Sequence, residues 1–326
     1  MNKEATESGL NREGPEVVTF GETMALFMPT GPKGIEYSPL LDKLFGGAES
    51  NVAIGLARLG HKVGWFGRLG SDPLGRMIYK RIRGEGVDVS RSVLTNDAAT
   101  GLMLRETVSG KSSVYYYRRN SAASGMKPEH LDESYIAQAR ILHVTGITPA
   151  LSESCRETLL EAIRLARKHG TKVCFDPNLR LKLWSADQAK EALLPLAEQA
   201  DYFLPGLDEL KLLYGTQDFS EIESRLRKLT GTCIVKGDRE THIVGKDRTI
   251  SVPFFQVDNV VDTVGAGDAF CAGFLSGVLR ELPVEEAVRL GNLLGSLVIQ
   301  FEGDWEGLPT AEQVEAALGN KAHIER

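Results

Sequence analysis

The most constraining feature of the sequence is an alternation between short apolar runs and segments with helical spacing. The runs are nearly continuous in Val, Ile and Phe, which is typical of strands covered on both faces. Alternation of this kind predicts an α/β fold: a doubly wound, mostly parallel sheet with helices on both faces. The six runs are Val17–Phe20, Val63–Phe66, Ile141–Val144, Val173–Phe175, Tyr202–Leu204 and Cys233–Val235.

Apolar residues at i, i+4 and i+7 followed by a glycine predict two of the helices between these runs. Two longer helical stretches, about 266–280 and 284–300, follow near the end of the chain. The two glycine-terminated patterns are Val52, Leu56, Leu59, Gly60 and Leu159, Ile163, Ala166, Gly170.

Two segments, about 24–45 and 98–123, break this rhythm. The second contains two β-prone runs around Ser109-Gly110-Lys111, which predicts a hairpin. We expect both segments to form a small β lid inserted into one domain spanning 17–326. The polar residues 1–16 lack the apolar stretch of a signal peptide and are expected to form a disordered tail.

Charge and composition exclude several classes of protein. A net charge of −6 gives no general attraction for nucleic acid, and no apolar run approaches the ~20 residues that span a bilayer. The four cysteines are too far apart for a CxxC motif, so we expect buried thiols in a reducing compartment and a cytoplasmic protein. They are Cys155, Cys174, Cys233 and Cys271.

The segment 262–270, DTVGAGDAF, carries the sharpest motif in the chain. Two glycines open directly into a predicted helix, where free N–H groups and the helix dipole favour an anion. The pattern alone leaves Asp268 equally open as a general base for phosphoryl transfer or as a helix cap. A dinucleotide-binding GxGxxG is disfavoured because Phe270 takes the third glycine position, and GxxxxGK[ST] is absent.

A second glycine pair, Gly46-Gly47, precedes the helix that begins near Val52. There a ligand hydroxyl could meet backbone N–H groups, and Asn51 could both donate and accept a hydrogen bond. A plain glycine turn with a Ser or Asn cap is the simpler structural alternative.

These motifs together resemble the PfkB/ribokinase family of carbohydrate kinases. The early signature runs from Gly46 to Gly75 and the late one is Asp262–Asp268, and the resemblance covers residue 17 to the end of the chain. It implies a ribokinase-like fold, Asp268 as catalytic base, and an anion hole at Gly265, Ala266 and Gly267. It also implies ATP with Mg²⁺ and leaves a monovalent-cation requirement open.

Within the family the chain is most similar to 2-keto-3-deoxygluconate kinases. The supporting segments are Ala48-Glu49, Tyr116–Ser124, Gly146–Ser152, Asp176–Arg180 and Leu183-Trp184. The implied reaction forms 2-keto-3-deoxy-6-phosphogluconate. A neutral-sugar kinase such as a fructokinase, a sugar or nucleotide sensor without turnover, and an NAD oxidoreductase remain the alternatives.

The substrate's charge is predicted from two arginines. Tyr116 and Arg118 are two apart in a strand and therefore share a face, and Arg180 follows the carboxyl end of another strand. Two guanidinium groups suit an acid sugar. For Tyr115 and Tyr117 we prefer a structural role in the lid, which we expect to form a homo-oligomer contact.

The resemblance assigns further residues to the ligands. Sugar binding is implied for Gly47, Asn51, Tyr116, Arg118, Asn178, Arg180, Asp268 and Asp304. Nucleotide binding is implied for Asn178, Arg180, Gly206, Lys236, Gly237, Gly265, Ala266, Gly267 and Asn292. Glu209 would act on the metal indirectly. The chain departs from the family at Gly206, where an Asn is usual, and at Glu240, where a Gly is usual in the adenine loop.

Overall fold

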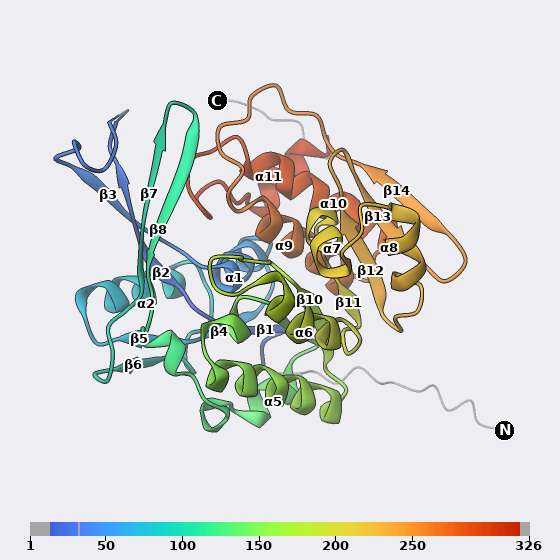
Figure 1. The fold of residues 1–326 in the computed structure, drawn as a ribbon, viewed down its shortest axis with the longest axis horizontal. Helices are drawn as coiled ribbons and strands as arrows, with labels where there is room; N and C mark the ends of the chain where they lie inside the picture. The colour runs from blue at the N-terminus through green and yellow to red at the C-terminus, as the bar shows by residue number, and fades with distance from the viewer. Residues whose placement is uncertain (1–13, 32, 320–326) are drawn as a thin grey trace.

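A computed structural model describes residues 14–31 and 33–319. Its main sheet has eight strands in the order β14-β13-β12-β11-β10-β9-β1-β4, parallel from β12 to β4, with β13 and β14 added antiparallel at one edge (Figure 1). The predicted doubly wound, mostly parallel sheet is confirmed, and the antiparallel edge is an addition. The strands are β1 (Val17–Phe20), β4 (Val63–Phe66), β9 (Ile141–Thr145), β10 (Lys172–Asp176), β11 (Tyr202–Phe203), β12 (Thr232–Lys236), β13 (Glu240–Val244) and β14 (Thr249–Pro253).

Helices cover both faces of this sheet, because successive strand residues point to opposite sides. Val17 packs into one hydrophobic core and Val18 into the other. The first face carries α1 (Ala48–Arg58), α2 (Pro73–Gly84), α9 (Ala266–Leu279), α10 (Val284–Val298) and α11 (Ala311–Ala317). The second carries α3 (Glu133–Gln138), α4 (Thr148–Leu151), α5 (Glu153–His169), α6 (Ala186–Ala197), α7 (Leu207–Tyr214) and α8 (Phe219–Leu226).

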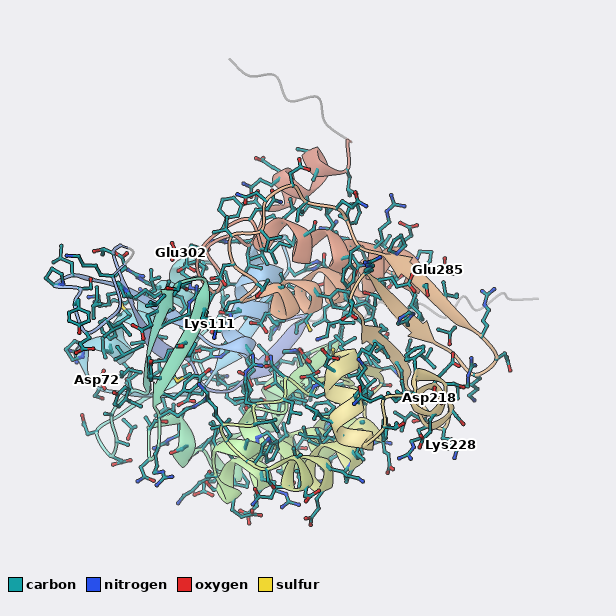
Figure 2. All side chains as sticks on the ribbon, turned by 45° about the horizontal axis from the view of Figure 1, so that its top comes forward. Asp72, Lys111, Asp218, Lys228, Glu285 and Glu302 are labelled. Atoms are coloured by element: carbon teal, nitrogen blue, oxygen red, sulfur yellow. The ribbon has the colours of Figure 1, made fainter. Side chains whose placement is uncertain are left out.

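A separate four-stranded sheet, β3-β2-β7-β8, forms the lid at the left of Figure 1. The predicted hairpin is present, and its turn residues Ser109 and Gly110 both have positive φ, as a two-residue β-hairpin turn requires. Figure 2 shows Asp72 at the opposite end of the molecule from Asp218 and Lys228, with Lys111 of this hairpin between them, left of the centre. The lid strands are β2 (Met24–Pro29), β3 (Leu41–Gly46), β7 (Leu102–Val108) and β8 (Lys111–Tyr117).

The remaining differences from the sequence-based expectations are local. A short parallel pair, β5 (Arg68–Gly70) and β6 (Val93–Thr95), was not expected. Glu16, assigned to the tail, bonds through its backbone to Lys62 and Arg140 at the end of the sheet, and residues 1–13 of the expected tail lie outside the described residues.

Two further expectations concern the cysteines and the membrane. All four cysteines are buried and free, as expected. Within the described ranges, no helix combines the length and apolarity needed to span a membrane.

Candidate active site

The anion-binding motif forms the N-terminus of α9. Gly265 is the N-cap residue with φ of +80°, and a side chain there would also collide with the carbonyl oxygen of Asp304. Both constraints require glycine. The first-turn N–H groups of a helix have no acceptor within the helix, and Gly267 of this turn lines a cavity. The turn can therefore stabilise negative charge at the cavity wall.

Asp268 lies in the first turn of α9 but makes no capping bond to its own helix. Instead Asn51 Nδ2 donates to its Oδ2 at 2.8 Å, and Asn178 Nδ2 to its Oδ1 at 3.4 Å. Burial raises the pKa of Asp268 to about 6, against the opposing effect of the Asn51 hydrogen bond. A carboxylate with this pKa is suited to accept a proton from a sugar hydroxyl near neutral pH. The geometry favours the base over the cap.

The glycine pair brings α1 against the same site. Gly47 is the N-cap of α1, and no side chain caps the first turn of this helix, so the glycine turn is present without the Ser or Asn cap of the structural alternative. The Asn51 Oδ1 accepts the Gly47 N–H at 3.5 Å, which orients its Nδ2 toward Asp268. A Cβ on Gly46 would collide with the carboxylate of Asp304, so these residues approach closely. The early and late motifs therefore meet at one place.

Tyr116 and Arg118 share a face, as their spacing predicts. The Arg118 Cζ lies 5.4 Å from the centre of the Tyr116 ring, and both residues line the cavity. Arg118 already has a protein partner: its Nε donates to Glu22 Oε2 at 2.6 Å, and its Nη2 pairs with the same oxygen. Ser121 Oγ donates to Glu22 Oε1 at 2.8 Å. Sequence reasoning missed Glu22, which lies just beyond the carboxyl end of β1.

A second buried arginine, Arg105, was also missed. It lies on β7 and pairs with Asp262 and Asp304, the latter through Nη1 and Oδ1 at 3.3 Å. Burial raises the pKa of Asp304 to about 7, while the charge of Arg105 opposes that rise. The β-strand period could have indicated Arg105, because it places this residue on the buried face with Met103.

The cavity wall at the carboxyl ends of β10 and β12 contains a partly buried ion pair. Lys236 Nζ lies 3.1 Å from Asp176 Oδ1, at the carboxyl ends of β12 and β10. Glu209 accepts the N–H of Leu179 at 2.6 Å and of Gly206 at 2.7 Å. At the departure position, Gly206 is the N-cap of α7 and has no side chain to accept a first-turn N–H, as an Asn could; Glu209 bonds back to the Gly206 N–H instead.

One cavity of about 970 Å³ joins these groups. Three predicted residues do not line it. Asn292 is turned inward, accepting from Thr241 and donating to backbone carbonyls of β14, so its side chain is committed to the fold. The other two are Ala266 and Gly237. The predicted residues that line it are Gly47, Asn51, Tyr116, Arg118, Asn178, Arg180, Gly206, Glu209, Lys236, Gly265, Gly267, Asp268 and Asp304.

Comparisons with known proteins find a matching family and similar enzymes. The model of the pfkB family carbohydrate kinases matches residues 15–311. The chain is 40% identical to the 2-dehydro-3-deoxygluconokinase of Bacillus subtilis strain 168, covering 93% of this chain and 95% of the relative. It is 33% identical to the probable fructokinase-6, chloroplastic, of Arabidopsis thaliana, covering 96% and 85%.

Solved structures share the fold. The PfkB protein from Polaromonas sp. JS666 superposes with a TM-score of 0.85 at 37% identity, covering 93% of this chain and 100% of that one. The fold is therefore ribokinase-like, and the chain is a sugar kinase, an enzyme that transfers phosphate to a hydroxyl. The chain belongs to the pfkB family of carbohydrate kinases.

Proposed function

We propose that the enzyme transfers the γ-phosphoryl group of ATP to the terminal hydroxyl of 2-keto-3-deoxygluconate. The products are ADP and 2-keto-3-deoxy-6-phosphogluconate. The observation that carries the chemistry is the buried carboxylate of Asp268, held by Asn51 and Asn178 at the N-terminus of α9. The 40% identity to a 2-dehydro-3-deoxygluconokinase supports the choice of sugar.

In this mechanism Asp268 takes the proton of the sugar hydroxyl as its oxygen attacks the γ-phosphorus. The bond between that phosphorus and the bridging oxygen breaks, and ADP leaves with the electron pair. The turn at Gly265–Gly267 faces the transferred group, where its N–H groups stabilise the developing charge. Lys236 is close to the same turn, since its Nζ lies 3.9 Å from the position a Cβ on Gly267 would take.

The acid group of the sugar is proposed to bind Arg118. Glu22 uses the Nε and Nη2 edge of the guanidinium, which leaves Nη1 for a ligand carboxylate. Arg180 supplies a second positive charge, close enough to Asp268 to oppose the rise in its pKa. Tyr116 would place its ring and hydroxyl beside the same sugar.

Mg²⁺ is proposed to enter with ATP. Among the described residues, no group of three or more His, Cys, Asp or Glu side chains is arranged to hold a metal, which fits an ion carried by phosphates and water. Glu209, whose oxygens already accept two backbone N–H groups, would act on it through water. When bound, the ion would neutralise negative charge on the phosphates. A monovalent cation remains outside this proposal.

A neutral sugar is the second candidate, and one observation favours it. Glu22 already neutralises Arg118. The cavity therefore carries less positive charge than Arg118 and Arg180 together suggest. Relatives at 33% identity or below include several fructokinases.

A coupled ADP-release assay separates the candidates. Each reaction contains the full-length enzyme, ATP, Mg²⁺ and one of 2-keto-3-deoxygluconate, fructose or no sugar. Release only with the acid sugar supports the proposal, and faster release with fructose replaces it with a fructokinase. Release with neither sugar above the sugar-free rate indicates that both sugar assignments are wrong.

A further inference from the structure

Arg105 is a charged side chain inside the lid that the phosphoryl-transfer chemistry does not use. Its side chain is only 4% exposed, and one guanidinium binds two carboxylates, those of Asp262 and Asp304. The three residues come from distant parts of the chain: β7, the segment before the α9 turn, and the loop after α10. Burying a charge is costly unless it is paired, so the arrangement holds these segments in a fixed relation.

Each carboxylate is attached in turn to the reacting region. Asp262 Oδ1 accepts the N–H of Val264 at 3.1 Å, within the turn that leads to Gly265. The carbonyl of Asp304 contacts Gly265, and its carboxylate contacts Gly46 of the early motif. Through Asp262 and Asp304, Arg105 therefore links the lid to the early glycine motif and to the turn at Gly265–Gly267.

The charges around Asp304 show why it needs this cation. Asp268, Glu306 and Asp262 are all acidic and all raise its pKa, in addition to the larger effect of burial. Arg105 is the cation that opposes them. Without it, an uncompensated carboxylate would take a proton or turn away toward water.

We propose that Arg105 is a positioning residue that fixes the Asp304 carboxylate beside the sugar and ties the lid strand to the anion-hole turn. This inference rests on the proposed function and on the sugar-binding role that the family resemblance implies for Asp304, in which its carboxylate would accept a hydrogen bond from a sugar hydroxyl. Arg105 itself acts through Asp304 and Asp262. Its loss is therefore expected to weaken sugar binding and orientation more than ATP binding.

The test measures kcat and the KM values for sugar and ATP in Arg105→Met, Arg105→Lys, Asp304→Asn and the Arg105→Met/Asp304→Asn double variant. The sugar is 2-keto-3-deoxygluconate or fructose, whichever the wild-type enzyme phosphorylates faster. Arg58→Met is the matched control, because Arg58 holds the same loop from outside the cavity by donating to the backbone carbonyls of Trp305 and Leu308.

Arg105→Met is expected to raise the sugar KM ~10-fold or more, the range for a lost charged hydrogen bond, with the ATP KM changed less than ~3-fold. Arg105→Lys should recover part of this, since an ammonium cannot form the same fork to two carboxylates. If Arg105→Met fails to fold, Arg105→Lys keeps the charge and decides the question alone. In the Asp304→Asn background, Arg105→Met should raise the sugar KM by less than a further ~3-fold, because the effects of substitutions at contacting residues are not additive.

A wild-type sugar KM in every Arg105 variant that folds would overturn the inference. An equal rise of the sugar KM in Arg58→Met would also overturn it, because loosening the loop would then be sufficient to weaken sugar binding. Full additivity of the Arg105→Met and Asp304→Asn effects on the sugar KM would overturn it as well. The proposed role of Asp304 fails separately, if Asp304→Asn alone leaves the sugar KM unchanged. A raised KM in Asp304→Asn with normal Arg105 variants rejects only the inference about Arg105.

Discussion

Replacing Asp268 with Asn removes the proposed proton acceptor while keeping the size of the side chain. The amide would present an NH₂ group to a donor of Asn51 or Asn178. Asn178 can relieve this by turning its amide, since its Oδ1 is buried with no hydrogen-bond partner. We therefore expect the Asp268→Asn enzyme to fold and bind ATP. Loss of a general base lowers the rate ~10²- to 10⁴-fold, equivalent to ~3–5 kcal/mol of transition-state stabilisation.

The pH profile gives an independent readout of the same residue. Only the ionised carboxylate accepts a proton, and its pKa is about 6, so kcat/KM of the wild-type enzyme should fall as pH drops through about 6. The residual activity of Asp268→Asn should lack this limb. Asp304→Asn is the control, because it keeps the base.

Stability should change in the opposite direction from activity. The pKa of Asp268 is raised in the folded state from 3.8 to about 6, so its ionisation lowers stability as pH rises between these two values, and the full cost is present above about 6. The neutral amide removes this cost. Thermal unfolding at pH 8 should therefore show a midpoint at or above that of the wild-type enzyme. Near-normal turnover in Asp268→Asn, with the acid limb retained, would refute the reasoning and leave Asp268 a structural role.

Three further predictions follow from other contacts. Arg118→Ala alone leaves the carboxylate of Glu22 buried without its arginine partner, so we expect the double variant Glu22→Gln/Arg118→Gln to fold better. In this double variant, steady-state kinetics should show kcat/KM for the acid sugar falling about 10- to 150-fold and kcat/KM for fructose barely changing. Equal losses for the two sugars would assign Arg118 a structural role in the lid. Burial raises the pKa of Glu49 to about 7, so Glu49→Gln should gain stability over wild type at pH 8 by roughly 2–3 kcal/mol and little at pH 5, and equal denaturant midpoints at pH 8 would contradict this. Tyr115 and Tyr117 leave the lid with exposed aromatic surface, so sedimentation should show at least a dimer at micromolar concentration, and a monomer would reject the lid contact.

The main sheet was predictable because its central strands are buried on both faces. Val17–Phe20 and Val63–Phe66 match β1 and β4 residue for residue, since a run without polar alternation has few other stable placements. The edge strand β14 was missed because Thr249–Pro253 is partly exposed and mixes polar with apolar residues. The hairpin of the lid was found from its Ser-Gly turn, a local signal.

The site was predictable where glycines and a helix start mark it in the sequence, as at Gly47 and Gly265. It was not predictable where function depends on which distant charge is paired. Glu22 and Arg118 are 96 residues apart, and Arg105 and Asp304 are 199 apart. Single charges in β-prone runs are usually solvated, and only the assembled fold shows that these are buried in pairs.

The identity of the sugar is tested most directly by internal competition. Wild-type enzyme receives equal concentrations of 2-keto-3-deoxygluconate and fructose with limiting ATP and Mg²⁺, and mass spectrometry measures the two sugar phosphates formed. Their initial ratio equals the ratio of the two kcat/KM values. If the carboxylate is held as proposed, the acid-sugar phosphate should exceed fructose phosphate by about 10-fold or more, the value of one charged hydrogen bond. An excess of fructose phosphate would contradict the acid-sugar assignment.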